Sequence, residues 1–419
     1  MSRHLSQSPQ CAEVGLLALG THPTLTLEAV TMLRDFAFGA AVKVRRMLGI
    51  TYKCAVFPDV CGDGEESLED PLASLIGRFE SPPPYERYTF QVISETVSVI
   101  AAQLLASLRI DTLVCTSPFV VCALMQKLLD KPMLGYLGLP LLWKRPTDHF
   151  DNATARAEFW ELLQHLLQSP QVVLATNNPV LTEQIAFQAP RALLPVVRPH
   201  ARFTNAVYTP TKPLEAMLVS RTKFLWVTLD CALQRFMDEQ YPIKFNVANS
   251  DSKLSFQEMA SHRAVVLLPW EHALMAFFEF YSMAIPLLLP SRDWALRLVF
   301  DAEGNLGATT SIYWDVSPGC DRQLGCDVSV RHPHPPFAFA PLESRKYWYQ
   351  YTSFAQFPHI HRFDSIPHLL QELLSVDAAT TSASMRAFND ETLVRSVGFW
   401  RSAGWRLGLP SCRSDLDAF

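Results

Sequence analysis

The chain has 419 residues, of which 49% are hydrophobic and 18% are charged. This composition is that of a globular protein and argues against intrinsic disorder, and the length favours two domains over one. The formal net charge of −5 provides no basic surface for a polyanion, so we expect no nucleic-acid partner.

In the first half of the chain, apolar runs that end at glycine, proline or polar residues alternate with amphipathic segments of helical length. We expect strands at residues 13–20, 52–57, 110–115, 132–136 and 171–175. Helices are expected at residues 25–47, 88–108, 120–129 and 153–168. Strands that alternate with helices in this way predict a doubly wound parallel sheet.

The same alternation resumes after residues 198–213, a proline-bearing segment with little periodicity that we interpret as a linker. We expect strands at residues 216–220, 243–247, 264–268, 285–289 and 359–363. Helices are expected at residues 224–239, 256–262, 345–354, 366–374 and 391–405. Between residues 300 and 343 glycine, proline and polar residues dominate, which predicts a long loop or an insertion.

These elements predict two α/β domains. We place an N-terminal Rossmann-like domain at residues 12–200 and a second at residues 214–385, with an irregular insertion at about residues 301–343. A C-terminal helix at residues 386–410 is expected to pack back on the N-terminal domain.

Two glutamates lie in the strand–helix–strand segment RAVVLLPWEHALMAFFEFYSMAIPLLLPS, residues 263–291. Glu271 follows the first strand at the turn, and Glu279 lies within an otherwise apolar helix, separated from Glu271 by seven residues. A carboxylate in an apolar helix needs a partner, because an unpaired buried charge is costly. That partner is either a ligand or a nearby arginine such as Arg263 or Arg292.

The segment resembles the E-x7-E region of retaining GT-B glycosyltransferases, including its ending in Met283, Pro286 and Pro290. The resemblance implies two Rossmann-like domains that face each other across a cleft, with a nucleotide-sugar donor bound by the second. It implies that Glu279 binds the donor ribose and that Glu271 lies near the donor sugar. The family often has glycines after the first glutamate, whereas this chain has His-Ala-Leu-Met at residues 272–275.

Three further residues of the second half are candidates for the donor site. Arg221 and Lys223 follow the expected strand at residues 216–220, where GT-B enzymes commonly place an Arg/Lys pair that faces the donor phosphates. Asn249, after the next strand, is a candidate for the same site. The structural alternatives are a solvated basic pair and an ordinary turn asparagine, and for Glu271 an acidic residue that complements a helix dipole.

Candidates on the acceptor side follow strands of the first half. His22 comes just after the first strand, where an imidazole can deprotonate an acceptor hydroxyl, and inverting GT-B enzymes resemble this arrangement. The alternative is a loop histidine without such a role. Asn177 and Asn178 follow the strand at residues 171–175 and would either bind the acceptor or cap the next helix.

We therefore predict a glycosyltransferase that moves a sugar from a nucleotide-sugar donor to an unidentified acceptor. The alternatives are a catalytically degenerate GT-B-like protein that binds a ligand or partner, and a sugar-nucleotide epimerase. No cofactor or metal is expected, because the spacing of Cys320, Cys326, His332 and His334 matches no standard zinc motif.

The cysteines and the apolar runs bear on the compartment. The nine cysteines have no repeating spacing, and Cys115, Cys122 and Cys231 lie in apolar runs, so we interpret them as small buried side chains in a reducing compartment. No uninterrupted stretch of 18 apolar residues exists, and the N-terminal apolar patch is short. We expect no transmembrane segment and a cytoplasmic location.

Overall fold

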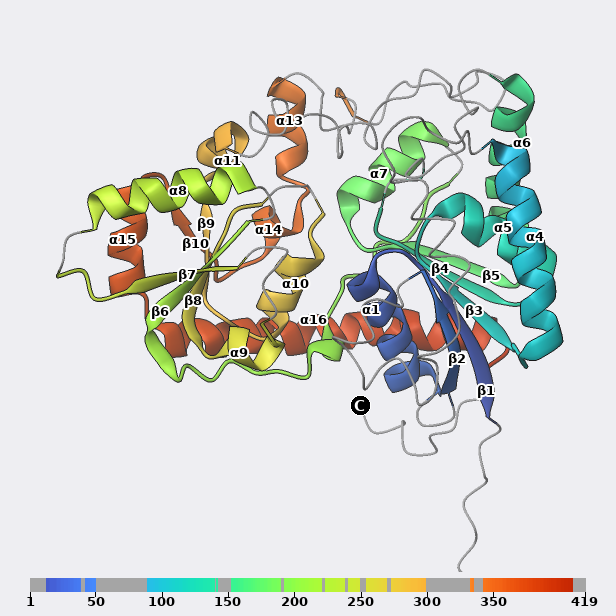
Figure 1. Ribbon diagram of the computed structural model, residues 1–419, viewed down its shortest axis with the longest axis horizontal. Coiled ribbons are helices and arrows are strands. Elements are labelled where there is room, and N and C mark those ends of the chain that lie inside the picture. The colour runs from blue at the N-terminus through green and yellow to red at the C-terminus, as the bar shows by residue number, and fades with distance from the viewer. Residues whose placement is uncertain are drawn as a thin grey trace, which may run out of the picture. The chain divides into compact units, whose positions relative to one another are not determined.

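The structure is a computed structural model (Figure 1), and it describes residues 13–38, 42–49, 89–139, 141, 152–189, 192–220, 223–237, 240–248, 254–269, 273–298, 332–334 and 342–409. The chain divides into two compact units. The first comprises Met1–Leu137, Arg145–Ala175 and Ser396–Phe419, and the second comprises Gly138–Lys144 and Thr176–Arg395. The domain limits predicted from the sequence, at residues 200, 214 and 385, stay a prediction.

The first sheet has five strands in the order β2-β1-β3-β4-β5. Its strands are β1 (Val14–Leu19), β2 (Val42–Leu48), β3 (Thr112–Cys115), β4 (Met133–Leu137) and β5 (Val172–Thr176). Pairing of β1 with β2 and β3, and of β3 with β4, is parallel. All six residues of β1 are buried, as expected for a central strand of a parallel sheet that is covered on both faces.

Helices follow these strands along the chain. They are α1 (Pro23–Leu33), the π-helical turn η1 (Arg34–Phe38), α4 (Phe90–Ser107), α5 (Phe119–Leu129) and α6 (Ala153–Gln168). In α4 the buried residues Ile93, Val97, Ile100 and Leu104 recur three or four positions apart and so form one face. Within the described part of the chain, α4 is the one helix long and apolar enough to cross a membrane, and a third of that window is buried. A helix with one face packed on its neighbours has the same composition.

The second sheet has the order β10-β9-β8-β6-β7, and its recorded pairings are parallel. Its strands are β6 (Lys212–Val219), β7 (Lys244–Ala248), β8 (His262–Leu267), β9 (Leu287–Pro290) and β10 (His361–Phe363). If the strands of each sheet are numbered in chain order from its own first strand, both sheets have the spatial order second, first, third, fourth, fifth, with the second sheet read from β7 to β10. This order is that of a doubly wound sheet, and the prediction of two parallel-sheet α/β domains is confirmed.

The helices of the second unit begin with α7 (Pro179–Gln188), which follows β5. The others are η4 (Arg202–Thr204), α8 (Lys223–Phe236), α9 (Phe256–Ala260), α10 (Met275–Ser282), α11 (Arg292–Leu298), α13 (Leu342–Tyr349), α14 (Ser353–Gln356) and α15 (Ile366–Ser375). The long helix α16 (Ala378–Arg406) begins in the second unit and ends in the first, where the ring of Trp400 lies 5.4 Å from that of Tyr136.

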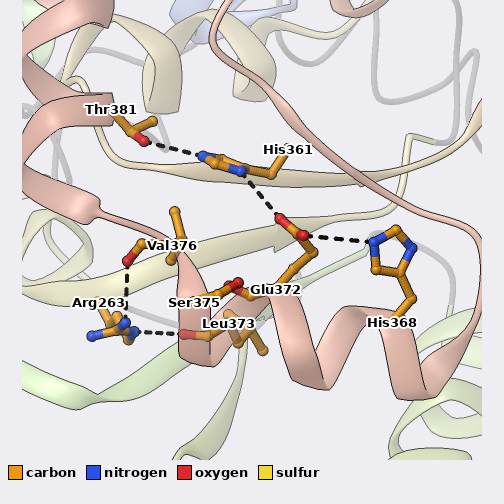
Figure 2. Close-up of polar contacts among 8 residues, drawn as sticks. All are labelled: Arg263, His361, His368, Glu372, Leu373, Ser375, Val376 and Thr381. Carbon is orange, nitrogen blue, oxygen red and sulfur yellow. Dashed lines mark hydrogen bonds and ion pairs between the residues drawn. The ribbon is translucent and has the colours of Figure 1, made fainter.

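Polar contacts hold α15 against β8 (Figure 2). The Arg263 guanidinium donates hydrogen bonds to the carbonyls of Leu373 (2.8 Å) and Val376 (3.3 Å), at the C-terminal end of α15. These carbonyls have no partner within the helix, so the cation satisfies them and complements the negative end of the helix dipole.

A second set of contacts in Figure 2 centres on Glu372 of α15. Its carboxylate lies 3.3 Å from Nδ1 of His361 in β10 and 3.5 Å from Nε2 of His368. The other ring nitrogen of His361 lies 3.1 Å from the Thr381 hydroxyl of α16. The imidazole therefore connects the short edge strand to both helices.

Four predictions about elements were wrong. The single helix expected at residues 345–354 is two helices, α13 and α14, separated by residues 350–352. The helix expected at residues 25–47 ends as α1 at Leu33, and residues 42–48 form β2, which pairs with the edge of β1. Hydrogen bonding along that edge outweighs the helical spacing of apolar residues, and Val42 and Val44 suit a strand. The final helix begins at Ala378 rather than residue 391, and β6 begins at Lys212, inside the expected linker. The strand expected at 52–57 and nearly all of the 301–343 insertion lie outside the described residues.

Candidate functional site

The shared strand order places one candidate site in each unit. In a doubly wound sheet, ligands bind at the carboxyl edge where the chain leaves adjacent strands in opposite directions. This position is called the switch point of the sheet. It lies between β1 and β3 in the first sheet and between β6 and β8 in the second. The loops that follow these four strands are therefore the first places to look for functional side chains.

At the end of β1, Gly20 allows two loops to approach closely. A Cβ atom added there would lie 2.2 Å from the hydroxyl oxygens of both Thr116 and Thr26. These two hydroxyls are buried and lie 2.8 Å apart, one after β3 and the other in α1. The hydroxyl pair thus joins the start of α1 to the edge of the sheet, over a position that has no room for a side chain.

The next residue, Thr21, is held by Ser117 of the loop after β3. Its backbone N–H donates to the Ser117 Oγ at 3.3 Å, and the two hydroxyl oxygens are 3.0 Å apart. Ser117 is 3% exposed, so its hydroxyl serves this contact rather than solvent. Neither residue stands out in the sequence, because the Thr-Ser-Pro triplet at 116–118 resembles any turn that closes a strand.

His22 follows Thr21 and is the N-cap residue of α1. Its carbonyl accepts hydrogen bonds from the Thr26 amide (3.1 Å) and the Thr26 hydroxyl (3.2 Å). Its ring Nδ1 lies 3.4 Å from the Thr24 hydroxyl, and the residue is half-buried. The structure therefore places the predicted base at the switch point of the first sheet, while its catalytic role stays a prediction.

The cysteines differ from the sequence-based expectation. Cys115 ends β3 and Cys122 lies in α5, and they are joined by a disulfide. Both are buried, as predicted, but they are not free thiols. Cys231 in α8 is a free thiol and is exposed, so its predicted burial was wrong. The run of apolar residues around it reflects only one face of an amphipathic helix.

At the switch point of the second sheet, the ends of β6 and β8 are joined by a hydrogen bond from the Leu268 amide to the Val219 carbonyl (3.0 Å). Ser220, directly after β6, is 1% exposed, and its hydroxyl has no hydrogen-bond partner in the part of the chain that the structure describes. A buried hydroxyl without a partner is costly, and such groups call for an explanation.

The structure describes only part of the predicted donor site. Arg221, Asn249 and Glu271 lie outside the described residues, and Lys223 is described only as the first residue of α8. In the sequence, Arg221 comes two positions after the end of β6 and Glu271 four positions after the end of β8, the two strands of the switch point.

Glu279 lies on α10, the helix that joins the adjacent strands β8 and β9. It is half-buried among the buried aromatic residues Phe278 and Phe280. The two arginines considered as structural partners bind elsewhere among the described contacts. Arg263 donates to carbonyls at the end of α15, and Arg292 contacts Asp293 at 3.2 Å.

Asn177 and Asn178 follow β5 and contact the helices of the second unit. The Asn178 side chain caps α7 by accepting from the Val180 amide (2.8 Å), and its amide nitrogen donates to the Ser353 hydroxyl at the start of α14 (3.4 Å). Asn177 is 2% exposed, and its amide nitrogen lies 3.7 Å from the sulfur of Met275, the first residue of α10. The capping alternative thus holds for Asn178, and an acceptor-binding role for either residue stays a prediction.

No three histidine, cysteine or acidic side chains gather as possible metal ligands within the described ranges. Of the residues considered for zinc, Cys320 and Cys326 lie outside those ranges. The ring of His332 lies between two polar side chains, with Nε2 3.1 Å from the Glu183 carboxylate and Nδ1 2.5 Å from the Tyr347 hydroxyl.

Comparisons with known proteins give structural neighbours only. No protein-family model matches the chain, and no curated protein sequence matches it. Similar solved structures include the glycosyltransferase VinC in complex with DTDP, with 12% identity and a TM-score of 0.43 over 94% of this chain and 100% of that chain. The calicheamicin glycosyltransferase CalG4 has 14% identity and a TM-score of 0.40 over 94% of this chain and 98% of that chain. A UDP-N-acetylglucosamine 2-epimerase has 11% identity and a TM-score of 0.37 over 67% of this chain and 80% of that chain.

Proposed function

We propose that the protein is a glycosyltransferase that uses a nucleotide-sugar donor, with the donor bound by the second unit and the acceptor by the first. The observation that carries the proposal is the position of the E-x7-E segment. Its first glutamate follows β8, a strand of the switch point, and its second lies on α10, which leads to the neighbouring strand β9. Ligands of doubly wound sheets bind at this edge.

The chemistry of the residues at this edge suits a nucleoside diphosphate sugar. A diphosphate needs hydrogen-bond donors and positive charge, which the Ser220 hydroxyl, Arg221 and Lys223 would supply. The vicinal hydroxyls of a ribose would donate to the Glu279 carboxylate. A phosphate oxygen would also give the buried Ser220 hydroxyl the acceptor that it lacks among the described residues.

Catalysis would consist mainly of positioning and of stabilising the departing diphosphate while positive charge develops on the sugar. We assign His22 to the acceptor hydroxyl, which the imidazole would deprotonate as the new glycosidic bond forms. The second candidate function is a protein that binds the nucleotide without turnover. The absence of glycine at residues 272–275 favours it, because a backbone next to the sugar phosphate usually needs glycine there.

The experiment is a panel of UDP-, GDP-, ADP- and TDP-sugars, with binding measured by calorimetry and nucleoside diphosphate release measured by chromatography. We expect one nucleotide class to bind and its diphosphate to be released slowly. Binding without release supports the second candidate, and formation of an epimeric sugar nucleotide supports an epimerase. If no member of the panel binds, the proposal is wrong.

A matched pair of variants ties binding to the site. Ser220→Ala should weaken binding of the nucleoside diphosphate by about 1 kcal/mol, the typical value of one hydrogen bond. Ser375→Ala, at an exposed position of α15 in the same unit, should leave the affinity unchanged. Equal affinities for the two variants would remove Ser220 from the donor site.

A further inference from the structure

The loop after β3 fixes the loop after β1 through one side chain. Ser117 Oγ accepts a hydrogen bond from the backbone N–H of Thr21 and also contacts its hydroxyl. Both Thr21 contacts are made to this one oxygen atom, and the residue Ser117 is almost completely buried. The backbone at Thr21 therefore depends on where the β3 loop holds Ser117.

His22 is positioned by the same contacts. On its N-terminal side the chain is held by Ser117 through Thr21. On its C-terminal side the His22 carbonyl accepts from the amide and hydroxyl of Thr26 in α1. A shift of Ser117 would move one of these two attachment points while the other stays fixed, and the imidazole would turn as a result.

Ser117 is itself enclosed by a covalent loop. The Cys115–Cys122 disulfide closes the segment that contains Thr116, Ser117 and Pro118, between the last residue of β3 and the first turn of α5. Both cysteines are buried, so the bond is part of the core beneath the switch point. A short closed loop restricts the backbone that it contains, whatever the thermodynamic origin of the restriction.

From these contacts we propose that Ser117 is a positioning residue for His22 and that the Cys115–Cys122 disulfide makes this positioning depend on redox state. The role of His22 as a base rests on the function proposed above, whereas its positioning by Ser117 does not. In the oxidised protein the β3 loop holds Thr21 and His22 in one arrangement. In the reduced protein the β3 loop is released, and the imidazole samples more than one orientation.

The chemical step is a thiol–disulfide exchange with a dithiol such as dithiothreitol. The S–S bond breaks, and each cysteine sulfur gains one electron and one proton. The reagent loses two electrons and two protons and closes to its cyclic disulfide. Because both sulfurs are buried, reduction needs the loop to open first, so Cys122→Ala serves as a permanently unlinked form that does not depend on this access.

The first experiment establishes the bond. The protein is denatured without reductant, alkylated and digested, and the peptides are examined by mass spectrometry. We expect Cys115 and Cys122 to be unmodified and linked, while Cys231, the exposed free thiol, is alkylated and serves as the internal control. Complete alkylation of Cys115 and Cys122 would overturn the redox part of the proposal.

The second experiment observes the imidazole directly. In protein labelled with 13C at the histidine Cε1 position, the His22 signal is assigned by its loss in His22→Gln. We expect Ser117→Ala and Cys122→Ala each to shift or broaden this signal, Ser117→Thr to restore it, and Cys231→Ser to leave it unchanged. If Ser117→Ala leaves the His22 signal where it is in the wild type, Ser117 does not position His22.

The third experiment measures turnover with the donor identified from the panel. Loss of positioning should lower kcat by about 10- to 100-fold in Ser117→Ala and Cys122→Ala, since small misplacements of a catalytic group have effects of this size. The KM for the donor should not change, because the donor is assigned to the second unit. Absence of turnover in the wild type would count against the proposed function alone, since the His22 signal still decides the positioning.

Discussion

The hydroxyl oxygens of Thr26 and Thr116 lie 2.8 Å apart, 90 positions apart in the chain, directly over Gly20. One belongs to α1 and the other to the loop after β3, so this contact joins the first helix to the third strand across the first. Both groups are buried, and each hydroxyl also lies within hydrogen-bonding distance of a backbone carbonyl, that of His22 for Thr26 and that of Leu19 for Thr116. The glycine between them is therefore required by space rather than by backbone conformation.

We predict that Gly20→Ala lowers the free energy of unfolding by about 1–3 kcal/mol, as overpacking of a tight core site does. The new Cβ would lie 2.2 Å from both threonine oxygens, and short β-branched side chains cannot move away easily. The control is Gly398→Ala in α16, where an added Cβ has no atom within 4 Å. This change should stabilise the helix by up to ~1 kcal/mol. Urea unfolding would show both, and equal stabilities would contradict the prediction.

The contact between Arg263 and the end of α15 gives a second prediction. Arg263→Met removes hydrogen bonds to the carbonyls of Leu373 and Val376 while it keeps much of the side-chain volume. We expect the free energy of unfolding to fall by about 1.5–3 kcal/mol, the range for hydrogen bonds to a charged group. Arg235→Met, at an exposed position in the last turn of α8, is the control and should change the unfolding midpoint little. If the two variants have the same unfolding midpoint, the Arg263 guanidinium contributes no more to stability than an exposed arginine does.

Much of the fold could be predicted because the strands of both sheets are short apolar runs with clear ends. β1 is buried over its whole length and β8 everywhere except at Arg263, and β1 and the last four positions of β8 carry no polar side chain. β2 could not be predicted in the same way, because its sequence VKVRRML places apolar residues at spacings that also fit a helix. Its strand conformation follows from pairing with β1, which is a long-range contact and leaves no local signal.

The candidate site was predictable only in part for a related reason. His22 could be selected because it follows a strand, a relation between neighbours in sequence. Its contact with Ser117 through Thr21 could not, because it joins residues 96 positions apart. The disulfide between Cys115 and Cys122 escaped prediction because it links a strand to the helix that follows it, and no spacing rule covers that pair.

For the acceptor side, we predict that His22→Ala lowers turnover about 10²–10⁴-fold, the usual contribution of a general base. Donor affinity should be nearly unchanged, because the donor residues are assigned to the second unit. The exposed His359 provides a control as His359→Asn, which should retain full activity. A retaining enzyme would show only a modest loss, since its leaving phosphate can assist the incoming hydroxyl. A large loss of donor affinity in His22→Ala would contradict the assignment of the two substrates.

For the donor side, we predict that Glu279→Gln weakens nucleotide binding by about 1–3 kcal/mol, the cost of losing a charge-assisted hydrogen bond. The amide keeps the shape of the side chain but accepts less strongly from ribose hydroxyls. Glu343→Gln in α13, whose carboxylate is 70% exposed, is the matched control for charge. Calorimetry with the nucleotide found in the panel would measure both. Unchanged affinity in a normally folded Glu279→Gln protein would assign Glu279 a structural role.

The last prediction concerns pH and follows from His200. Burial, together with the neighbouring cations Arg198 and Arg202, lowers the pKa of His200 to about 3. In the unfolded chain the imidazole titrates near 6.5. Between these two values the unfolded state binds a proton that the folded state does not, so the free energy of unfolding falls as the pH falls from about 6.5 towards 3.

At pH 5 the free energy of unfolding is lower by ~2 kcal/mol because of His200. This value follows from about 1.36 kcal/mol for each of the one and a half pH units below 6.5. His200→Gln has no such proton to bind, so its stability should fall less than that of the wild type between pH 7 and pH 5. His359→Asn removes an exposed histidine and should keep the wild-type pH dependence. Urea unfolding of the three proteins at pH 7, 6 and 5 measures the slopes. Parallel slopes for His200→Gln and the wild type would show that His200 is protonated in the folded protein as readily as in the unfolded chain.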